Sequence, residues 1–471
     1  MLFSSLPFMI FFLPLFFFVY FMAKKRSTRN IVMLIFSLFF YAWGEIYYVY
    51  LIIFSVAVNY FMAVMIDKSQ PGDIKTRRGR RILIINIVFN LLIIGFFKYA
   101  DFLMSIISQI PGVELKSLNI PLPLGISFFT FQIVSYVIDV YNKKVASQKN
   151  LLFLGTYIIG FQHLVAGPIV RYETIAYELE NRTENIREIA DGLRRFTAGL
   201  AKKVLIANNM AVLCDTIWAY EPSRSGAVGM WIAVVAYTMQ IYYDFSGYSD
   251  MAIGLGKMMG FHYLENFNYP YISQSVTDFW RRWHISLSTF FRDYIYIPMG
   301  GNRVKTSRWI LNMMTVWLLT GLWHGAAWTF ILWGVYYGVL LIIEKLLLQN
   351  TLVKIPVLRN IYALAAIMFG WIIFRSDSAA QIGVVVKTMF GAYGSGSFIG
   401  LVSAGAVRPM SVIAGIAGII YSMPASRRLK DIFLRKPYLP YVYDAAAIAI
   451  MFLCILTLAQ GSYNPFIYFR F

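Results

Sequence analysis

His324 lies in the stretch LTGLWHGAAW, residues 319–328, where no other side chain can ionise. The chain carries no Asp, Glu, Lys or Arg from Trp309 to Ile343. Burying a group that can take up a proton in such a stretch is costly. Apolar surroundings keep an imidazole neutral and able to accept a proton, so His324 is a candidate general base that could deprotonate an alcohol attacking a thioester. The alternative is a histidine that only hydrogen-bonds between helices.

Two further stretches place polar groups among aromatic residues. Residues 277–303 contain the ionisable side chains Asp278, Arg281, Arg282, His284, Arg292, Asp293 and Arg303. Residues 242–271 place four polar side chains beside an apolar helix: Asp244, Ser246, Ser249 and Asp250. Such residues at membrane depth usually face a protein interior or a watery path. Together with His324 they predict a polar tunnel.

Other chemistries find little support in the sequence. It contains neither a G-x-S-x-G nucleophile elbow nor an H-E-x-x-H motif, and its four histidines are too dispersed to predict a metal site. Cys214 and Cys454 stand in apolar contexts without a CxxC pair, so we expect two buried free thiols. The stretch GLGKMMG, residues 254–260, departs from the dinucleotide fingerprint and suits close helix packing.

The composition defines an integral membrane protein. Hydrophobic residues make up 59% of the 471 residues and charged residues 14%, whereas soluble domains average roughly 25% charged. The net charge of +19 does not indicate nucleic acid here, because the basic residues cluster in short loops between apolar runs. Residues 24–29 and 67–81 are two such loops, and we expect both to face anionic lipid in the cytoplasm.

We predict an all-α fold of about 11–13 membrane segments, some broken or re-entrant, in a single domain over residues 1–471. The apolar run 31–66 is interrupted at Gly44–Glu45, and 309–343 is too long for one crossing. The second run should break at a glycine, for which Gly321, Gly325 and Gly334 are candidates. Residues 171–195 read as amphipathic surface helices whose apolar face is made by Ile186, Ile189, Leu193 and Phe196.

The motifs resemble one known family along nearly the whole chain. GLWHGAAW (321–328) resembles the histidine motif of the membrane-bound O-acyltransferase (MBOAT) superfamily. DFWRRWHISLSTFFRDYIYIPMGGNR (278–303) resembles the second signature of its bacterial alginate and polysaccharide O-acetyltransferase branch. Further similar stretches are YYDFSGYSDMAIGLGKMMGF (242–261), LVAGPIVRY (164–172), GWIIFR (370–375) and NPFIYFRF (464–471). Gln162 departs from the proline often found at its position in relatives.

The resemblance implies a fold with a funnel on each side of a thin waist, in a bacterial inner membrane, with His324 at the waist. It implies transfer of an acyl group, usually acetyl, from a cytoplasmic thioester such as acetyl-CoA to a hydroxyl. A polysaccharide is the implied acceptor, reached through an extracytoplasmic acetyltransferase partner, and no permanently bound cofactor is expected. His284 matches the family's second prominent histidine, with a structural or donor-positioning role.

Other site residues follow from this assignment. Arginines suit phosphate recognition, so a basic entry for an anionic donor would include Arg281, Arg282, Arg292 and Arg303. Positive-inside topology explains these charges equally well. Trp323, Trp328 and Trp333 would wall the tunnel, and Asp244, Ser246 and Asp250 would contact the acceptor or the partner. Two alternatives remain open: D-alanyl transfer to teichoic acids from a carrier protein, and a transporter or flippase without covalent chemistry.

Overall fold

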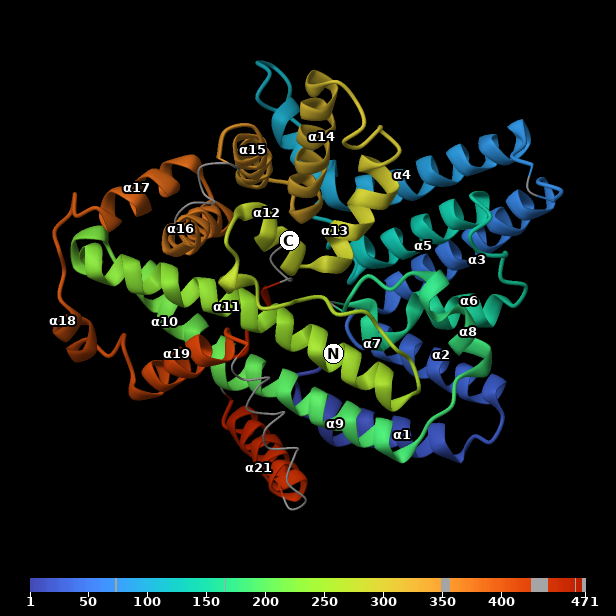
Figure 1. Ribbon diagram of the computed structural model, residues 1–471, viewed down its shortest axis with the longest axis horizontal. Coiled ribbons are helices and arrows are strands. Elements are labelled where there is room, and N and C mark those ends of the chain that lie inside the picture. Colours follow the sequence, from blue (N-terminus) through green and yellow to red (C-terminus); the bar gives the residue numbers. More distant parts are fainter. Residues whose placement is uncertain (73, 166, 349–355, 425–438, 462, 468–471) are drawn as a thin grey trace. The chain divides into compact units, whose positions relative to one another are not determined.

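The computed structural model describes residues 1–471 apart from 73, 166, 349–355, 425–438, 462 and 468–471, and within these ranges all regular elements are helices (Figure 1). The described chain forms two compact units: Met1–Phe196 with Ala252–Leu264, and Thr197–Met251 with Glu265–Phe471. An all-α membrane fold is thereby confirmed. The expectation of one domain over residues 1–471 stays a prediction.

The first unit is built from the amino-terminal helices. In chain order they are the π-helix η1 (Pro7–Phe12), α1 (Leu13–Met22), α2 (Arg26–Ala42), α3 (Ile46–Lys68), α4 (Arg77–Ile107), α5 (Ile126–Tyr141), α6 (Leu151–Ile159), α7 (Phe161–Leu164), α8 (Tyr172–Asn181) and most of α9 (Ile186–Ala201). The end of α11 (Pro222–Met258) also belongs to this unit. The chain breaks between α2 and α3 at Gly44–Glu45, as the sequence predicted.

The second unit carries both histidine motifs. Its elements are η2 (Lys202–Ala207), α10 (Asn208–Trp218), most of α11, η3 (Pro270–Ile272), α12 (Val276–Arg282), α13 (Ile285–Phe291), η4 (Arg292–Tyr296), α14 (Thr306–His324), α15 (Trp328–Ile343), η5 (Glu344–Leu348), α16 (Pro356–Arg375), α17 (Ala379–Met389), α18 (Phe398–Ser403), α19 (Pro409–Tyr421) and α21 (Leu439–Ala459). Gly226 interrupts α11 with φ 56° and ψ −175°, so its first turn is kinked away from the rest.

Among the described helices, five are long and apolar enough to cross a membrane: Ile46–Lys68, Arg77–Ile107, Trp328–Leu348, Val357–Arg375 and Leu439–Ala459. Four shorter apolar helices accompany them: Pro7–Met22, Ile126–Tyr141, Ala379–Met389 and Pro409–Tyr421. Large apolar side chains such as Phe54 and Leu92 are more than half exposed, which suits a face that meets lipid. The total of 11–13 segments stays a prediction.

The long run 309–343 breaks at one of the three expected glycines. Helix α14 ends at His324, Gly325 has extended backbone, and α15 begins at Trp328. The prediction is wrong for Gly321 and Gly334, which lie inside α14 and α15. Their missing side chains let the two helices touch, since a Cβ at Gly334 would overlap the carbonyl oxygen of Trp317.

Helices α9 and α11 run side by side through matched glycines (Figure 1). In the first unit, a Cβ at Gly254 would lie 2.6 Å from the carbonyl oxygen of Gly192. In the second unit, a Cβ at Gly199 would lie 2.5 Å from the carbonyl oxygen of Gly247. The close-packing interpretation of 254–260 is confirmed at Gly254. The predicted apolar face of α9 is only partly buried. Phe196 is buried, whereas Ile186 and Leu193 are exposed, because the glycines and Phe196 form the side of α9 that packs against α11.

Buried amides join two of the membrane spans. Asn59 of α3 accepts hydrogen bonds from Asn86 and Asn90 of α4 at 2.6 and 2.8 Å. All three side chains are at most 2% exposed. Hydrogen bonds between apolar helices of this kind stabilise helix pairs in membranes, so the cluster fixes the α3–α4 pair.

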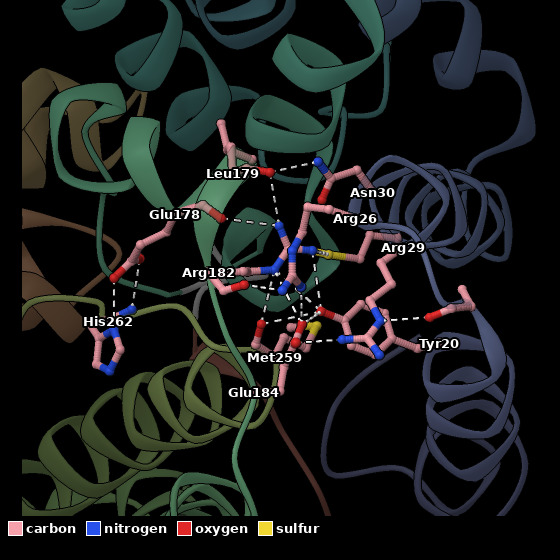
Figure 2. A network of polar contacts seen from close by, with 12 residues as sticks. Tyr20, Arg26, Arg29, Asn30, Glu178, Leu179, Arg182, Glu184, Met259 and His262 are labelled. Carbon is pink, nitrogen blue, oxygen red and sulfur yellow. Dashed lines mark hydrogen bonds and ion pairs between the residues drawn. The ribbon is translucent and has the colours of Figure 1, made fainter.

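A network around Arg182 ties together four segments of the first unit (Figure 2). The fully buried Arg182 guanidinium donates to the Tyr20 hydroxyl at 3.2 Å and to the Met259 carbonyl at 3.0 Å. Glu184 pairs with Arg26 and Arg29 and accepts a hydrogen bond from Tyr20 at 2.5 Å. The network joins α1 and α2 to the α8–α9 linker and to the end of α11.

Candidate active site

His324 is the last residue of α14 and is held by aromatic rings. The imidazole centroid lies 4.7 Å from Trp323, 4.9 Å from Trp333 and 5.1 Å from Phe374, with the planes 70–83° apart. The residue is only 8% exposed. These contacts from α14, α15 and α16 fix the ring's orientation and shield it from water.

His284 precedes α13 and shares one neighbour with His324. Its ring centroid lies 5.8 Å from Trp323, which also contacts His324, and 4.7 Å from Phe245 in an edge-to-face contact. The residue is 1% exposed and its backbone is left-handed, with φ 45° and ψ 55°. The structure therefore brings together three predicted site residues, with the indole of Trp323 in contact with both imidazoles.

Trp333 links this site to a larger aromatic cluster. Trp280 of α12 contacts Trp317, Trp333 and Tyr337, with ring centroids 4.8–5.5 Å apart. These contacts pack α12 against α14 and α15 beside His324. Of the three tryptophans expected to wall a tunnel, Trp323 and Trp333 lie against His324. Trp328 is 63% exposed, because its side chain points outward from the first turn of α15, so it does not line this buried site.

Two positioning groups were not predicted from the sequence. Asn266 accepts hydrogen bonds beside His284, and Glu344 accepts hydrogen bonds at the start of α12. The Glu344 carboxylate accepts from the backbone N–H of Val276 at 2.6 Å and from that of Thr277 at 2.8 Å. It thus anchors the helix that leads to His284. For Asn266 the only available signal was its place within the polar stretch 242–271.

The four predicted donor-binding arginines lie at the surface of the second unit. Arg281, Arg292 and Arg303 are exposed and Arg282 is half-buried. Arg282 donates to Asp278 at 2.8 Å, and Arg292 makes a bidentate pair with Asp293 at 2.6 and 3.1 Å. Two of the four cations are therefore partly neutralised by carboxylates of the same stretch.

The two carboxylates of α11 have partners within the chain. Asp244 pairs with Lys203 at 2.6 Å, and both side chains are at most 2% exposed. The Asp244 carboxylate also accepts from the backbone N–H of Ile467 at 2.8 Å, so it holds the segment that ends the described chain. Asp250 pairs with Lys202 at 2.6 Å. Ser246 is 2% exposed, and its hydroxyl has no hydrogen-bond partner among the described residues.

Known proteins share extended sequence similarity with this chain. Residues 124–376 match the MBOAT, membrane-bound O-acyltransferase family, and this span includes His284, His324, Asn266 and Phe374. The chain is 36% identical to the probable alginate O-acetylase AlgI of Pseudomonas aeruginosa, with both proteins covered completely. It is 42% identical to the protein of that name from Azotobacter vinelandii, over 83% of this chain and 78% of the relative. A peptidoglycan O-acetyltransferase of Helicobacter pylori is 34% identical, over 84% and 80% respectively.

The fold and the matched motifs define a multi-pass membrane acyltransferase. The chain belongs to the MBOAT family, and it is an O-acyltransferase.

Proposed function

We propose that this protein moves an acetyl group from the bacterial inner membrane toward hydroxyls of an extracytoplasmic polysaccharide, an exopolysaccharide such as alginate or a cell-wall polymer. The donor is a cytoplasmic thioester, acetyl-CoA in the first instance. The observation that carries the proposal is that His324 and His284 both contact the indole of Trp323, within the span that matches the family. Complete coverage of a relative named for alginate O-acetylation supports the class of acceptor.

His324 acts as general base in this proposal. It takes the proton of the acceptor hydroxyl while the oxygen attacks the thioester carbonyl carbon. A C–O bond forms, the C–S bond breaks, and the thiolate leaves with the proton returned by the imidazolium. The products are the ester and the free thiol. A positioned base of this kind contributes roughly 10²–10⁴-fold to the rate.

The remaining site residues have subsidiary roles. Arg281, Arg282, Arg292 and Arg303 attract the phosphates of the donor, and Trp323 orients the reacting groups between the two imidazoles. Ser246 is available to hydrogen-bond the acceptor, whereas Asp244 and Asp250 reach it only if their pairs with Lys203 and Lys202 open. In the cell, an extracytoplasmic acetyltransferase partner takes over the acetyl group and completes its transfer to the polymer. With the purified chain, a soluble oligosaccharide supplies the acceptor hydroxyl instead.

The test uses purified full-length protein in proteoliposomes supplied with radiolabelled acetyl-CoA and a soluble oligosaccharide acceptor. We expect labelled acceptor from the wild type and a loss of about 10²–10⁴-fold for His324→Gln, with acetyl-CoA still bound. His262→Gln is the matched histidine control, because His262 is exposed and lies in the first unit; it should keep wild-type activity.

Three outcomes would contradict the proposal. Label transferred only from a charged carrier protein would identify D-alanyl-type transfer. Unchanged transfer by His324→Gln would remove the general base. Movement of an unmodified polymer across the membrane, without any acetylation, would identify a transporter or flippase.

A further inference from the structure

Asn266 and His284 stand on two chain segments that are fastened to each other. The backbone N–H of Ile285 donates to the Asn266 carbonyl at 3.0 Å, and that of Asn268 donates to the Arg282 carbonyl at 2.9 Å. The side-chain oxygen of Asn266 then lies 3.2 Å from His284 Nδ1. Asn266 is 1% exposed, so these bonds form out of contact with water. The relative position of amide and imidazole is therefore fixed by backbone as well as side-chain contacts.

The identity of the amide atom that faces His284 follows from a third group. Asn266 Oδ1 lies 3.1 Å from the backbone nitrogen of Ser286, which can only donate a hydrogen bond. The Asn266 atom that faces this N–H must be the amide oxygen, because a flipped amide would place its NH₂ group against the N–H of Ser286, donor against donor. The hydroxyl of Ser286 also donates to this oxygen at 2.9 Å.

The tautomer of His284 follows from that assignment. An amide oxygen only accepts, so His284 Nδ1 carries the hydrogen of this bond. The ring neighbours given by the structure, Asn266, Ser286, Phe245 and Trp323, are all uncharged. A buried imidazole in uncharged surroundings stays neutral, so Nε2 has a lone pair. That atom is buried and has no hydrogen-bond partner among the described residues.

Two unfavourable features thus coincide at His284. A buried acceptor without a partner costs about 1–3 kcal/mol. The left-handed backbone of a residue other than glycine costs a similar amount. Strained backbone clusters at functional sites, and a buried polar atom without a partner calls for an explanation, so both features mark His284 as a candidate binding group.

We propose that Asn266 is a positioning residue that holds His284 as the Nδ1–H tautomer and presents the Nε2 lone pair to a hydrogen-bond donor of the substrate. The donor is a neutral O–H or N–H, either the acceptor's hydroxyl or an amide of the thioester. The role in catalysis rests on the proposed function; the tautomer itself does not. Asn266 acts through His284 and touches no reacting atom.

The tautomer is tested directly on the wild-type chain. ¹⁵N-histidine labelling of the full-length protein in detergent distinguishes protonated from unprotonated ring nitrogens, and His284→Gln identifies the signals of His284. We expect a protonated Nδ1 and an unprotonated Nε2 at neutral pH. A protonated Nε2, with or without a protonated Nδ1, would overturn the inference. This measurement needs no substrate, so a wrong donor or acceptor in the proposed function leaves it unaffected.

Activity of Asn266 variants tests the positioning role. Asn266→Ala removes the acceptor at Nδ1 and should lower kcat by about 10²-fold, as expected for a misplaced catalytic group. Asn266→Asp keeps an acceptor there, so activity should return at alkaline pH. Its carboxylate favours the imidazolium, so the acidic limb of the pH profile should move to higher pH by about one unit or more. A rise in the KM of the thioester alone, or of the acceptor alone, identifies which substrate supplies the donor.

Asn312→Ala is the matched control. Asn312 is equally buried and donates to the carbonyls of Met299 and Gly301, but no hydrogen bond joins it to a histidine among the described contacts. Its removal should leave the shape of the pH profile unchanged. If Asn266→Asp and Asn266→Ala lose the same activity with the same profile, Asn266 is only structural and the positioning role is refuted.

Discussion

Trp323 is the residue on which the two imidazoles converge. Its ring lies 4.7 Å from His324 and 5.8 Å from His284, so its volume sets the spacing of both. Replacing it with alanine would leave space into which either imidazole can turn. A displacement of about 1 Å in a catalytic group can lower the rate by about 10²-fold.

We therefore expect Trp323→Ala to lower kcat by about 10²-fold, whereas Trp323→Phe, which retains an aromatic ring, should lose less than about tenfold. Initial rates in proteoliposomes measure the difference. Trp328→Ala is the control, because Trp328 is exposed in the same motif and should keep near wild-type rates. Equal losses for alanine and phenylalanine would show that the indole contributes something other than volume.

At this scale the sequence was informative where a residue type is rare for its surroundings. A lone histidine in an apolar run pointed to His324, and the same stretch supplied Trp323. Phe374 and Asn266 were not predicted as neighbours of the histidines. Phe374 is one of many phenylalanines in apolar helices, and Asn266 is an asparagine in a polar loop, so nothing in the adjacent sequence indicates that either contacts a histidine. Their roles depend on α16 and on the 266–268 segment folding against the histidine motifs.

At the scale of elements, glycine has two opposite uses in α14 and α15. Gly325 ends a helix, whereas Gly321 and Gly334 lie within helices and allow them to touch. Sequence alone predicts that a largely apolar run of 35 residues must break, because one helix of that length would exceed the membrane. It does not say which glycine breaks the run, since close packing depends on the partner helix.

The crossing of α14 and α15 sets the position of His324 against Trp333. Gly334→Ala forces the helices apart, because the new methyl group meets the backbone carbonyl of Trp317. We expect a loss of stability of about 1–3 kcal/mol, together with reduced acyl transfer. Thermal unfolding of the detergent-solubilised protein and initial rates measure the two effects.

Gly383→Ala in α17 is the control for that variant. No atom lies within 4 Å of the position that the new methyl group would take, so only helix propensity changes, in favour of alanine by up to about 1 kcal/mol. Destabilisation of both variants to the same extent would contradict the packing argument.

For the whole molecule, hydropathy and charge predicted the class of protein and little of its internal assembly. The apolar runs identified membrane helices. The predicted basic loops 24–29 and 67–81 are shorter in the structure, because α2 begins at Arg26, α3 extends to Lys68 and α4 begins at Arg77. The stretch 24–29 also supplies Arg26, the first residue of α2, which the structure pairs with Glu184. Arg26, whose charge the positive-inside pattern alone had explained, therefore also forms an ion pair inside the fold. Pairing between residues more than 150 positions apart leaves no periodic trace in one sequence.

Stability of the whole protein should depend on pH through one exposed histidine of the first unit. His262 donates to Glu178 at 2.7 Å (Figure 2). It also lies 3.3 Å from Glu188, so it links α8 and α9 to the loop after α11. The hydrogen bond to Glu178 raises the pKa of His262, although partial burial opposes the rise. The link is complete below the ordinary histidine pKa near 6.5 and is lost as the pH rises through the higher folded value.

His262→Gln should therefore weaken this link at pH 6 but not at pH 9. Because the histidine is more than half exposed, solvent screening limits its contribution to roughly 0.5 kcal/mol. That energy corresponds to about a twofold change in the local opening equilibrium of α8 and α9. Hydrogen exchange across residues 172–201, corrected for the intrinsic pH dependence, should be about twofold faster in the variant at pH 6 and equal to the wild type at pH 9. The same difference at both pH values would show that the ring acts by packing alone, because its charge would then have no part in holding the two helices.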